Sequence, residues 1–240
     1  LALGLDYLMD MKSNSTFPYL SANIKNKSGA FLFKPYNILT RGNLTLGIIG
    51  LSSVFESEEV TIADLFESLD KIISFVEEQT DVIVLLFNAK DQDLARFHQA
   101  DYPVDFVIQS KSKRRSSDGG KKDTPVYSCG SRGKYIYDFE FTYNDLNNEF
   151  VDIAMHESAK SIMQRKITRL EKRMDQNPNP DETLLKIEDL QYKIQSEDRI
   201  INAAENTIIL NQVALDKTII DESEVLKIVD AGIVRRNAFG

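Results

Sequence analysis

The sequence has few of the residues that carry redox and metal chemistry. Its 240 residues include one cysteine, Cys129, two histidines and no tryptophan. A single cysteine excludes an internal disulfide and any cysteine-rich zinc or haem site. The sequence also lacks a run of about 18 apolar residues, so no transmembrane segment is predicted. The net charge of −8 argues against a nucleic-acid-binding protein, because neutralising phosphates requires a basic face.

The composition is otherwise that of a globular protein, with 42% hydrophobic and 28% charged residues. The chain begins Leu1-Ala2-Leu3, without an initiator methionine or a basic leader. We therefore expect it to be a mature or excised piece of a longer protein.

Residues 1–146 alternate between apolar strands and amphipathic helices. Residues 34–39 and 44–51 read as two strands joined by a turn at Arg41-Gly42-Asn43. The runs expected to be further strands are 81–87, 104–109 and 135–143, and the expected helices are 3–12, 61–79 and 91–100. An apolar strand of this kind is usually buried on both faces. The pattern predicts a layered α/β domain.

From residue 147 the composition changes to long polar helices. A first arm carries apolar residues at alternating four- and three-residue steps, and the sequence "NPNPDET" then interrupts it. Apolar residues then recur every seven positions; the repeat is Ile187, Ile194, Ile201, Ile208 and Leu215. The second arm is expected to end before Leu215. We predict a coiled-coil-like antiparallel hairpin over 147–206. Residues 207–240 would then return a strand to the sheet and end in a short helix at 222–231.

A basic loop follows the strand at 104–109. The strand stops on Gln109-Ser110-Lys111-Ser112-Lys113, in a chain that is acidic as a whole. Three interpretations remain open: a solvated loop, a patch that docks a partner, or an anion-binding site formed by Lys111, Lys113 and Arg114.

Five segments, in order, resemble a known family. They are "FPYLSANI", "KPYNILTRGNLTLGIIGL", "DVIVLLFNAKDQDLAR", "VDFVIQSKSK" and "PVYSCGSRGKYIYDFEFTYN". Together they are similar to the metallophosphoesterase domain of the exported 5′-nucleotidase and cyclic-phosphodiesterase family. The resemblance covers about residues 3–145 and implies only the C-terminal part of that domain. It implies a layered metallophosphoesterase-like sandwich, with mixed sheets flanked by helices and the long antiparallel hairpin as an insertion.

The resemblance also implies a metal site that this sequence has lost. In the family, histidines end the two matching strands and help to hold two divalent metal ions, which clamp a phosphoryl oxygen and activate water. The positions here are Asn88, Lys111 and Lys113, and a lysine ammonium has no free lone pair for a metal. The two histidines, His98 and His156, fall at no family ligand position. We therefore expect no catalytic residues, no bound metal and no other cofactor.

Three functions stay open at this point. The first is a catalytically degenerate module that acts as a scaffold, with its hairpin contacting a protein partner or a second copy of the chain. The second is an active metal-dependent phosphoesterase, a nucleotide hydrolase whose metal ligands lie upstream of Leu1. The third is a phosphate- or nucleotide-binding module that uses Lys111 and Lys113. Family resemblance further implies a periplasmic or extracellular location.

Overall fold

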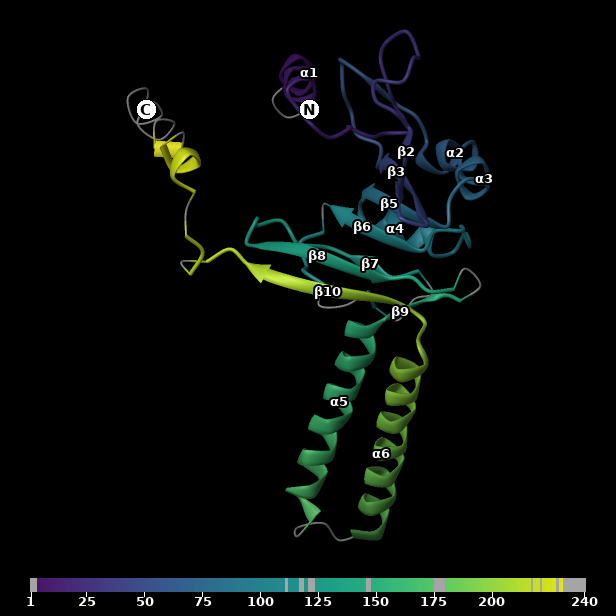
Figure 1. The fold of residues 1–240 in the computed structure, drawn as a ribbon, viewed down its shortest axis with the longest axis vertical. Helices are drawn as coiled ribbons and strands as arrows, with labels where there is room; N and C mark the ends of the chain where they lie inside the picture. Colours follow the sequence, from purple (N-terminus) through teal and green to yellow (C-terminus); the bar gives the residue numbers. More distant parts are fainter. Residues whose placement is uncertain are drawn as a thin grey trace.

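The structure is a computed structural model that describes residues 4–110, 112–116, 119–120, 124–145, 148–174, 180–216, 218–220, 222–227 and 229–230. These residues form a layered α/β body from which a pair of long antiparallel helices projects (Figure 1). The observed architecture confirms the predicted fold class, a mixed α/β sandwich with a helical hairpin insertion.

A mixed five-stranded sheet forms the centre of the body. Its strands, in spatial order, are β2 (Tyr36–Arg41), β3 (Leu44–Ser52), β5 (Val82–Asn88), β6 (Phe106–Ser110) and β7 (Val126–Tyr127). β2 pairs with β3 in the antiparallel direction, and the other neighbours are parallel. The turn between β2 and β3 pairs Arg41 with Leu44, and Gly42 has a φ of 59°, a conformation that glycine adopts without strain. The predicted turn is confirmed.

Three helices cover one face of this sheet. They are α2 (Leu65–Asp70), α3 (Ile73–Glu77) and α4 (Asp91–Phe97). Successive residues of a strand point to opposite faces, so Ile83, Leu85 and Phe87 of β5 lie in the core beneath the helices. Gly47 of β3 allows the close approach, because an added Cβ would lie 2.4 Å from a methyl carbon of Val76.

The prediction of one continuous helix over 61–79 is wrong. Residues Thr61–Ile62 form the short strand β4, which pairs with β1 (Ile24–Lys25). The helical region then begins at Leu65, after the N-cap Asp64, whose side chain accepts hydrogen bonds from two backbone N–H groups of α2. It divides into α2 and α3. Strand pairing with a distant segment has replaced the first turn of the expected helix.

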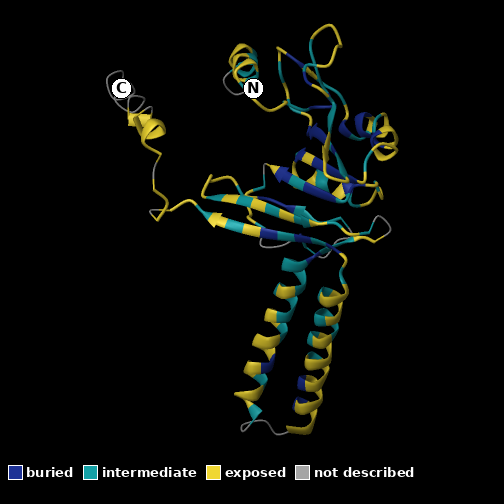
Figure 2. Ribbon diagram, in the orientation of Figure 1, coloured by how far each residue is buried: buried dark blue, intermediate teal, exposed yellow. Residues whose placement is uncertain are grey.

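A second, three-stranded sheet covers the other face of the central sheet. Its order is β8 (Tyr135–Thr142), β10 (Asn206–Ala214) and β9 (Phe150–Asp152). The alternate residues of the central strands, Val82 and Val84 of β5 among them, pack against Ile208 and Leu210 of β10. Buried residues are concentrated in the central sheet, in the helices beside it and in β10 (Figure 2). The strand that returns after the hairpin is confirmed.

The hairpin leaves the body between β9 and β10. It consists of α5 (Ile153–Glu171) and α6 (Pro180–Ala203), which run side by side in opposite directions (Figure 1). Ile167 and Ile187 are its buried apolar residues, and Nδ1 of His156 lies 2.5 Å from Oε2 of Glu197 on the other helix. The hairpin therefore has a short buried seam of its own.

The two ends of the described chain lie outside the sandwich. The helix α1 (Leu5–Ser13) precedes the body, and residues 223–227 and 229–230 are helical. Residue 231, the expected end of the last helix, lies outside the described residues. No helix among the described segments combines the length and the apolar character that crossing a membrane requires.

Candidate functional site

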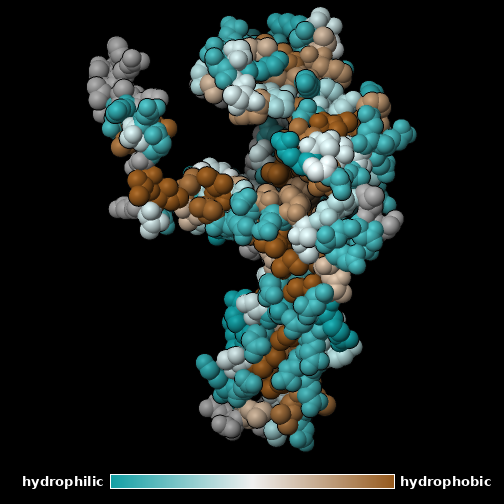
Figure 3. Space-filling view, viewed as in Figure 1, coloured by the Kyte–Doolittle hydropathy of each residue, from teal (hydrophilic) through white to brown (hydrophobic). Residues whose placement is uncertain are grey.

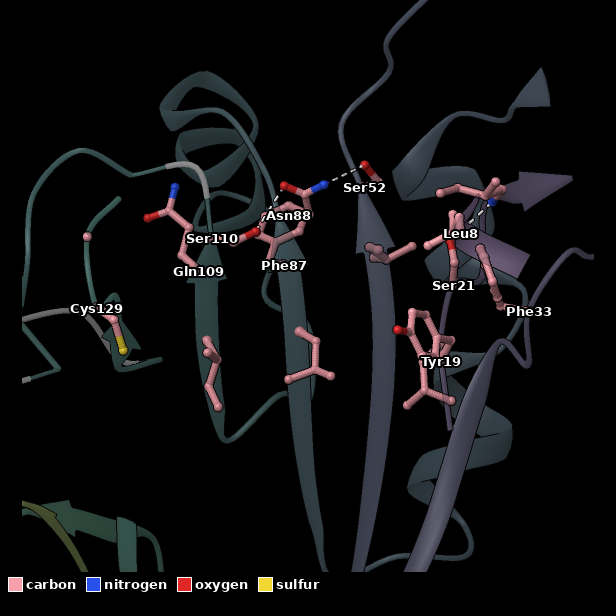
Figure 4. Close-up of a pocket in the computed structure, with 16 residues that line it drawn as sticks. Leu8, Tyr19, Ser21, Phe33, Ser52, Phe87, Asn88, Gln109, Ser110 and Cys129 are labelled. Carbon is pink, nitrogen blue, oxygen red and sulfur yellow. Dashed lines mark hydrogen bonds between the residues drawn. The ribbon is translucent and has the colours of Figure 1, made fainter. Parts of the chain in front are cut away.

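A cavity of about 420 Å³ lies at the carboxyl ends of β3, β5 and β6. This edge is where open α/β sheets bind ligands, because the strands end there and the following loops diverge. Figure 4 shows the residues around it: strand ends on one side, and side chains from α1 and the segment at 19–33 on the other. The fold thus has a cavity at the carboxyl edge of the central sheet.

Three polar side chains form a ladder across the strand ends. Ser52, Asn88 and Ser110 are direct neighbours in the register of β3, β5 and β6. Nδ2 of Asn88 donates to Oγ of Ser52 at 3.2 Å, and Oγ of Ser110 donates to Oδ1 of Asn88 at 2.9 Å (Figure 4). Both ends of the Asn88 amide are therefore used within the protein, by groups that carry no charge.

Buried amides and hydroxyls behind the ladder hold the strand ends in place. Asn23 is fully buried; its side chain accepts from the Ser52 N–H at 3.0 Å and donates to the Ser52 carbonyl at 2.7 Å. Oγ of Ser53 donates to Oδ2 of Asp93 at 2.5 Å. Gln109 is buried and donates to the Ala89 carbonyl at 3.1 Å. These satisfied contacts account for the polar residues that the sequence places at the strand ends.

Aromatic rings and a thiol complete the wall of the cavity. Tyr19 stacks on Phe33 with ring centroids 6.0 Å apart. Cys129 lies on the opposite side (Figure 4). Desolvation raises the pKa of the Cys129 thiol, against a weaker lowering effect of a hydrogen bond with the backbone of Tyr137. A raised pKa keeps the thiol protonated at neutral pH, which is the reverse of what activates a cysteine nucleophile.

The basic loop lies beside the cavity and does not line it where it is described. Lys113 and Arg114 are exposed, and neither is among the lining residues. The guanidinium of Arg115 lies 3.9 Å from the centroid of the Tyr135 ring and donates to Gln212, so it is held against the second sheet. Lys111, which we predicted to be a former metal-ligand position and part of an anion site, lies outside the described residues.

The chemistry of the described residues does not fit a two-metal centre. Among them, no three His, Cys, Asp or Glu side chains come together in a way that would hold a metal ion. His156 pairs with Glu197 in the hairpin, and His98 lies at the end of α4. The family resemblance implies imidazole groups at the strand ends. This chain has the Asn88 amide there, hydrogen-bonded to the hydroxyls of Ser52 and Ser110. Neutral amide and hydroxyl groups are poor substitutes for imidazole in binding zinc-like ions.

Sequence reasoning identified one member of the polar ladder and missed its surroundings. The family resemblance identified Asn88 as the position that matches a family histidine at a strand end. The partnership of Ser52 with Asn88 was not predicted, although a parallel register brings the last residues of neighbouring strands together. Asn23 was missed as well, because a single polar residue in an irregular segment gives no periodic signal.

Comparison with known proteins gives a likeness of fold. No family model matches the chain, and no curated protein resembles it in sequence. A Staphylococcus aureus protein assigned as a 5′-nucleotidase has a similar structure, with a TM-score of 0.54 and 22% identity over 62% of this chain. The sulfate thiohydrolase SoxB of Thermus thermophilus gives a TM-score of 0.52 and 19% identity over 58%.

The matched regions amount to 34% and 28% of those two proteins, so this chain spans well under two thirds of their length. The described α/β body therefore has a fold similar to that of part of these two proteins.

Proposed function

We propose that this chain is a catalytically degenerate metallophosphoesterase-like module that serves as a scaffold for a protein partner. The single observation that carries the proposal is the neutral ladder of Ser52, Asn88 and Ser110 at the carboxyl edge of the sheet. This edge is where a metallophosphoesterase fold would need histidines and carboxylates.

The ladder opposes metal binding for two physical reasons. First, the Asn88 amide already donates to one hydroxyl and accepts from another, so binding an ion would require breaking at least one of these contacts. Second, none of the three groups carries the negative charge that offsets the desolvation of a divalent cation. In this proposal Asn88, Lys111 and Lys113 stand at former ligand positions.

The hairpin supports the scaffold part of the proposal. Two helices of 19 and 24 residues are longer than a connection between β9 and β10 requires, since β9 and β10 are neighbours in one sheet. They project from the body and present most of their surface to solvent (Figure 2). A projecting hairpin of this kind offers a partner a binding surface.

Two further parts of the proposal rest on the family resemblance. We place the protein outside the cytoplasm, in the periplasm or at the cell surface, as members of the resembled family are. We also take the chain to be the C-terminal part of the family's domain. We do not favour a role in phosphate binding, because the described basic residues Lys113 and Arg114 lie away from the cavity lining.

Hydrolysis assays test the proposal. The full-length protein, with any native sequence that flanks these 240 residues, would be incubated with bis(p-nitrophenyl) phosphate and with nucleoside monophosphates, in buffer containing Mn²⁺ or Zn²⁺. We expect no hydrolysis above the rate of the metal-containing buffer. Turnover that depends on metal would contradict the proposal and would favour a hydrolase whose ligands lie upstream of Leu1.

A further inference from the structure

A groove runs along one face of the hairpin. Two adjoining cavities of about 390 Å³ and 290 Å³ lie between α5 and α6, and both are lined by Lys166 and Leu190. They extend from Ala159, near the body, to Arg173, near the tip. At 1.5 Å per residue this stretch of α5 is about 20 Å long, the length of a helix of about four turns.

The groove has an apolar floor. Its apolar lining residues are Ala159, Ile162, Met163, Leu170 and Leu190. Helical periodicity places Gln164, Thr168 and Glu171 on the other side of the α5 seam, so that side is polar. Figure 3 shows a stripe of hydrophobic atoms along the hairpin between two hydrophilic margins. A helix pair with one apolar and one polar side is typical of two thirds of a three-helix bundle.

The rim of the groove is basic, in a chain whose net charge is −8. Lys166, Arg169 and Arg173 are exposed, and within the described part of the chain none of them forms an ion pair. The acidic lining residues are engaged already: Asp189 pairs with Lys193 at 2.5 Å, and Glu197 pairs with His156. Among the described residues, these three cations beside the apolar floor have no ion-pair partner.

We propose that this groove binds an acidic amphipathic helix of a partner protein. The apolar face of that helix would cover the floor at Leu170 and Leu190, and its carboxylates would pair with Lys166, Arg169 and Arg173. This inference rests on the scaffold role proposed above and names the kind of partner that the hairpin takes.

Other occupants fit the groove less well. A second copy of the hairpin would bring the same three cations against the first set, and like charges repel. A membrane surface is flat and favours apolar side chains that protrude, whereas these apolar residues form the floor of a groove. Nucleic acid would pair with the cations and leave the apolar floor without a partner.

A peptide titration tests the proposal. The probe is a fluorescein-labelled helical peptide of about 18 residues, with leucines on one face and glutamates on its flanks. Its binding to the whole chain is followed by fluorescence anisotropy. A second peptide, with lysine in place of each glutamate, serves as the charge control. We expect the acidic peptide to bind and the basic one to show no saturable binding.

Matched charge-reversal variants locate the binding site. The double variant Lys166→Glu/Arg173→Glu changes the groove. The control Arg165→Glu/Lys172→Glu makes the same change in charge at two exposed positions, one on α5 and one just after its end, that do not line the groove. We expect the groove variant to weaken binding by about tenfold or more, and the control variant to change it by less than about threefold. Circular dichroism of both variants confirms that the helices are intact.

Three results would overturn the proposal: no saturable binding of the acidic peptide, equal weakening by the two variants, or a groove-dependent preference for anionic phosphatidylglycerol vesicles over the peptide. The outcome is independent of the hydrolysis assay. If the chain neither hydrolyses phosphoesters nor binds the acidic helix, the proposed partner is wrong and the degenerate site still stands. If it hydrolyses phosphoesters, the degenerate site is wrong, whatever the groove binds.

Discussion

Asp152 connects the central sheet, the second sheet and the hairpin through one buried carboxylate. Its Oδ2 accepts from the Tyr127 hydroxyl at 2.8 Å and from the Gly119 N–H at 2.5 Å, and its Oδ1 accepts from the Met155 N–H at 3.0 Å. The residue is buried, and it is the N-cap of α5. Tyr127 is fully buried as well, so it serves packing and this network.

The first prediction concerns this network. Replacing Asp152 with alanine removes the cap of α5 and leaves a buried hydroxyl and a buried N–H without their acceptor. We expect the free energy of unfolding, measured by urea denaturation, to fall by about 3 kcal/mol. Tyr127→Phe, which removes one hydrogen bond, should cost about 1 kcal/mol. The account of this network is wrong if the two variants are equally stable.

A second prediction concerns the pH dependence of stability at Asp105. Burial raises the pKa of this carboxyl, and a hydrogen bond from the Ile83 N–H at 2.7 Å opposes the shift. The raised pKa means that the folded state binds the proton more tightly than the unfolded state. The stability contributed by the protonated group is therefore complete below the ordinary pKa of 3.8 and is lost as pH rises through the raised pKa.

The variant Asp105→Asn cannot ionise and still offers Ile83 an acceptor oxygen. Its free energy of unfolding relative to the wild type should therefore rise between about pH 3 and about pH 7. Urea denaturation of both proteins across this range measures the difference. If the difference in free energy of unfolding stays constant or falls with increasing pH, burial does not raise the pKa of Asp105.

At the scale of elements, the hairpin should be able to loosen without the body. Its buried apolar residues are Ile167 on α5, which is 2% exposed, and Ile187 on α6, which is 7% exposed. We expect the double variant Ile167→Ala/Ile187→Ala to accelerate amide hydrogen exchange in α5 and α6 and to leave β3 and β5 unchanged, because a cavity costs stability where it forms.

The control for this prediction is Leu185→Ala, since Leu185 is 66% exposed on α6. It should leave exchange in the hairpin close to that of the wild type. Accelerated exchange in β3 and β5 of the double variant would mean that the hairpin and the body unfold as one unit.

Elements that local sequence determines were predicted well, and elements that depend on contacts between distant residues were not. The strands β3, β5 and β6 are long apolar runs, and the turn at Gly42 has its own signal, so local sequence sufficed. The pairing of β1 with β4 depends on contacts between residues about forty positions apart, as with Ile24 and Ile62. β7 and β9 are too short to show a period.

The isoleucine repeat of the second arm shows the same limit. The seven-residue spacing continues through Ile208, yet α6 ends at Ala203 and Ile208 is fully buried in β10. β-Branched residues around Ile208 correctly predicted a strand there. The repeat within the helix did not reveal the basic groove, because the groove depends on how the two arms are placed against each other.

For the whole molecule, the layers could be predicted, whereas the expected loss of the metal site and the protein partner both stay predictions. The order of strands and helices, with the resemblance, led to the α/β sandwich that the structure has. The candidate site was predicted only in part, at Asn88, since its other members meet through the register of separate strands. The roles of Lys111 and Lys113 at former ligand positions stay predictions.

We propose that the strand ends of this fold no longer hold metal ions. Elemental analysis tests it most directly, on full-length protein incubated with Mn²⁺ and Zn²⁺ and then passed through a desalting column. The account predicts well below one equivalent of either metal per chain. Two tightly bound ions per chain, about the number that a two-metal phosphoesterase requires, would contradict it and would make the ladder of Ser52, Asn88 and Ser110 a support for a working centre.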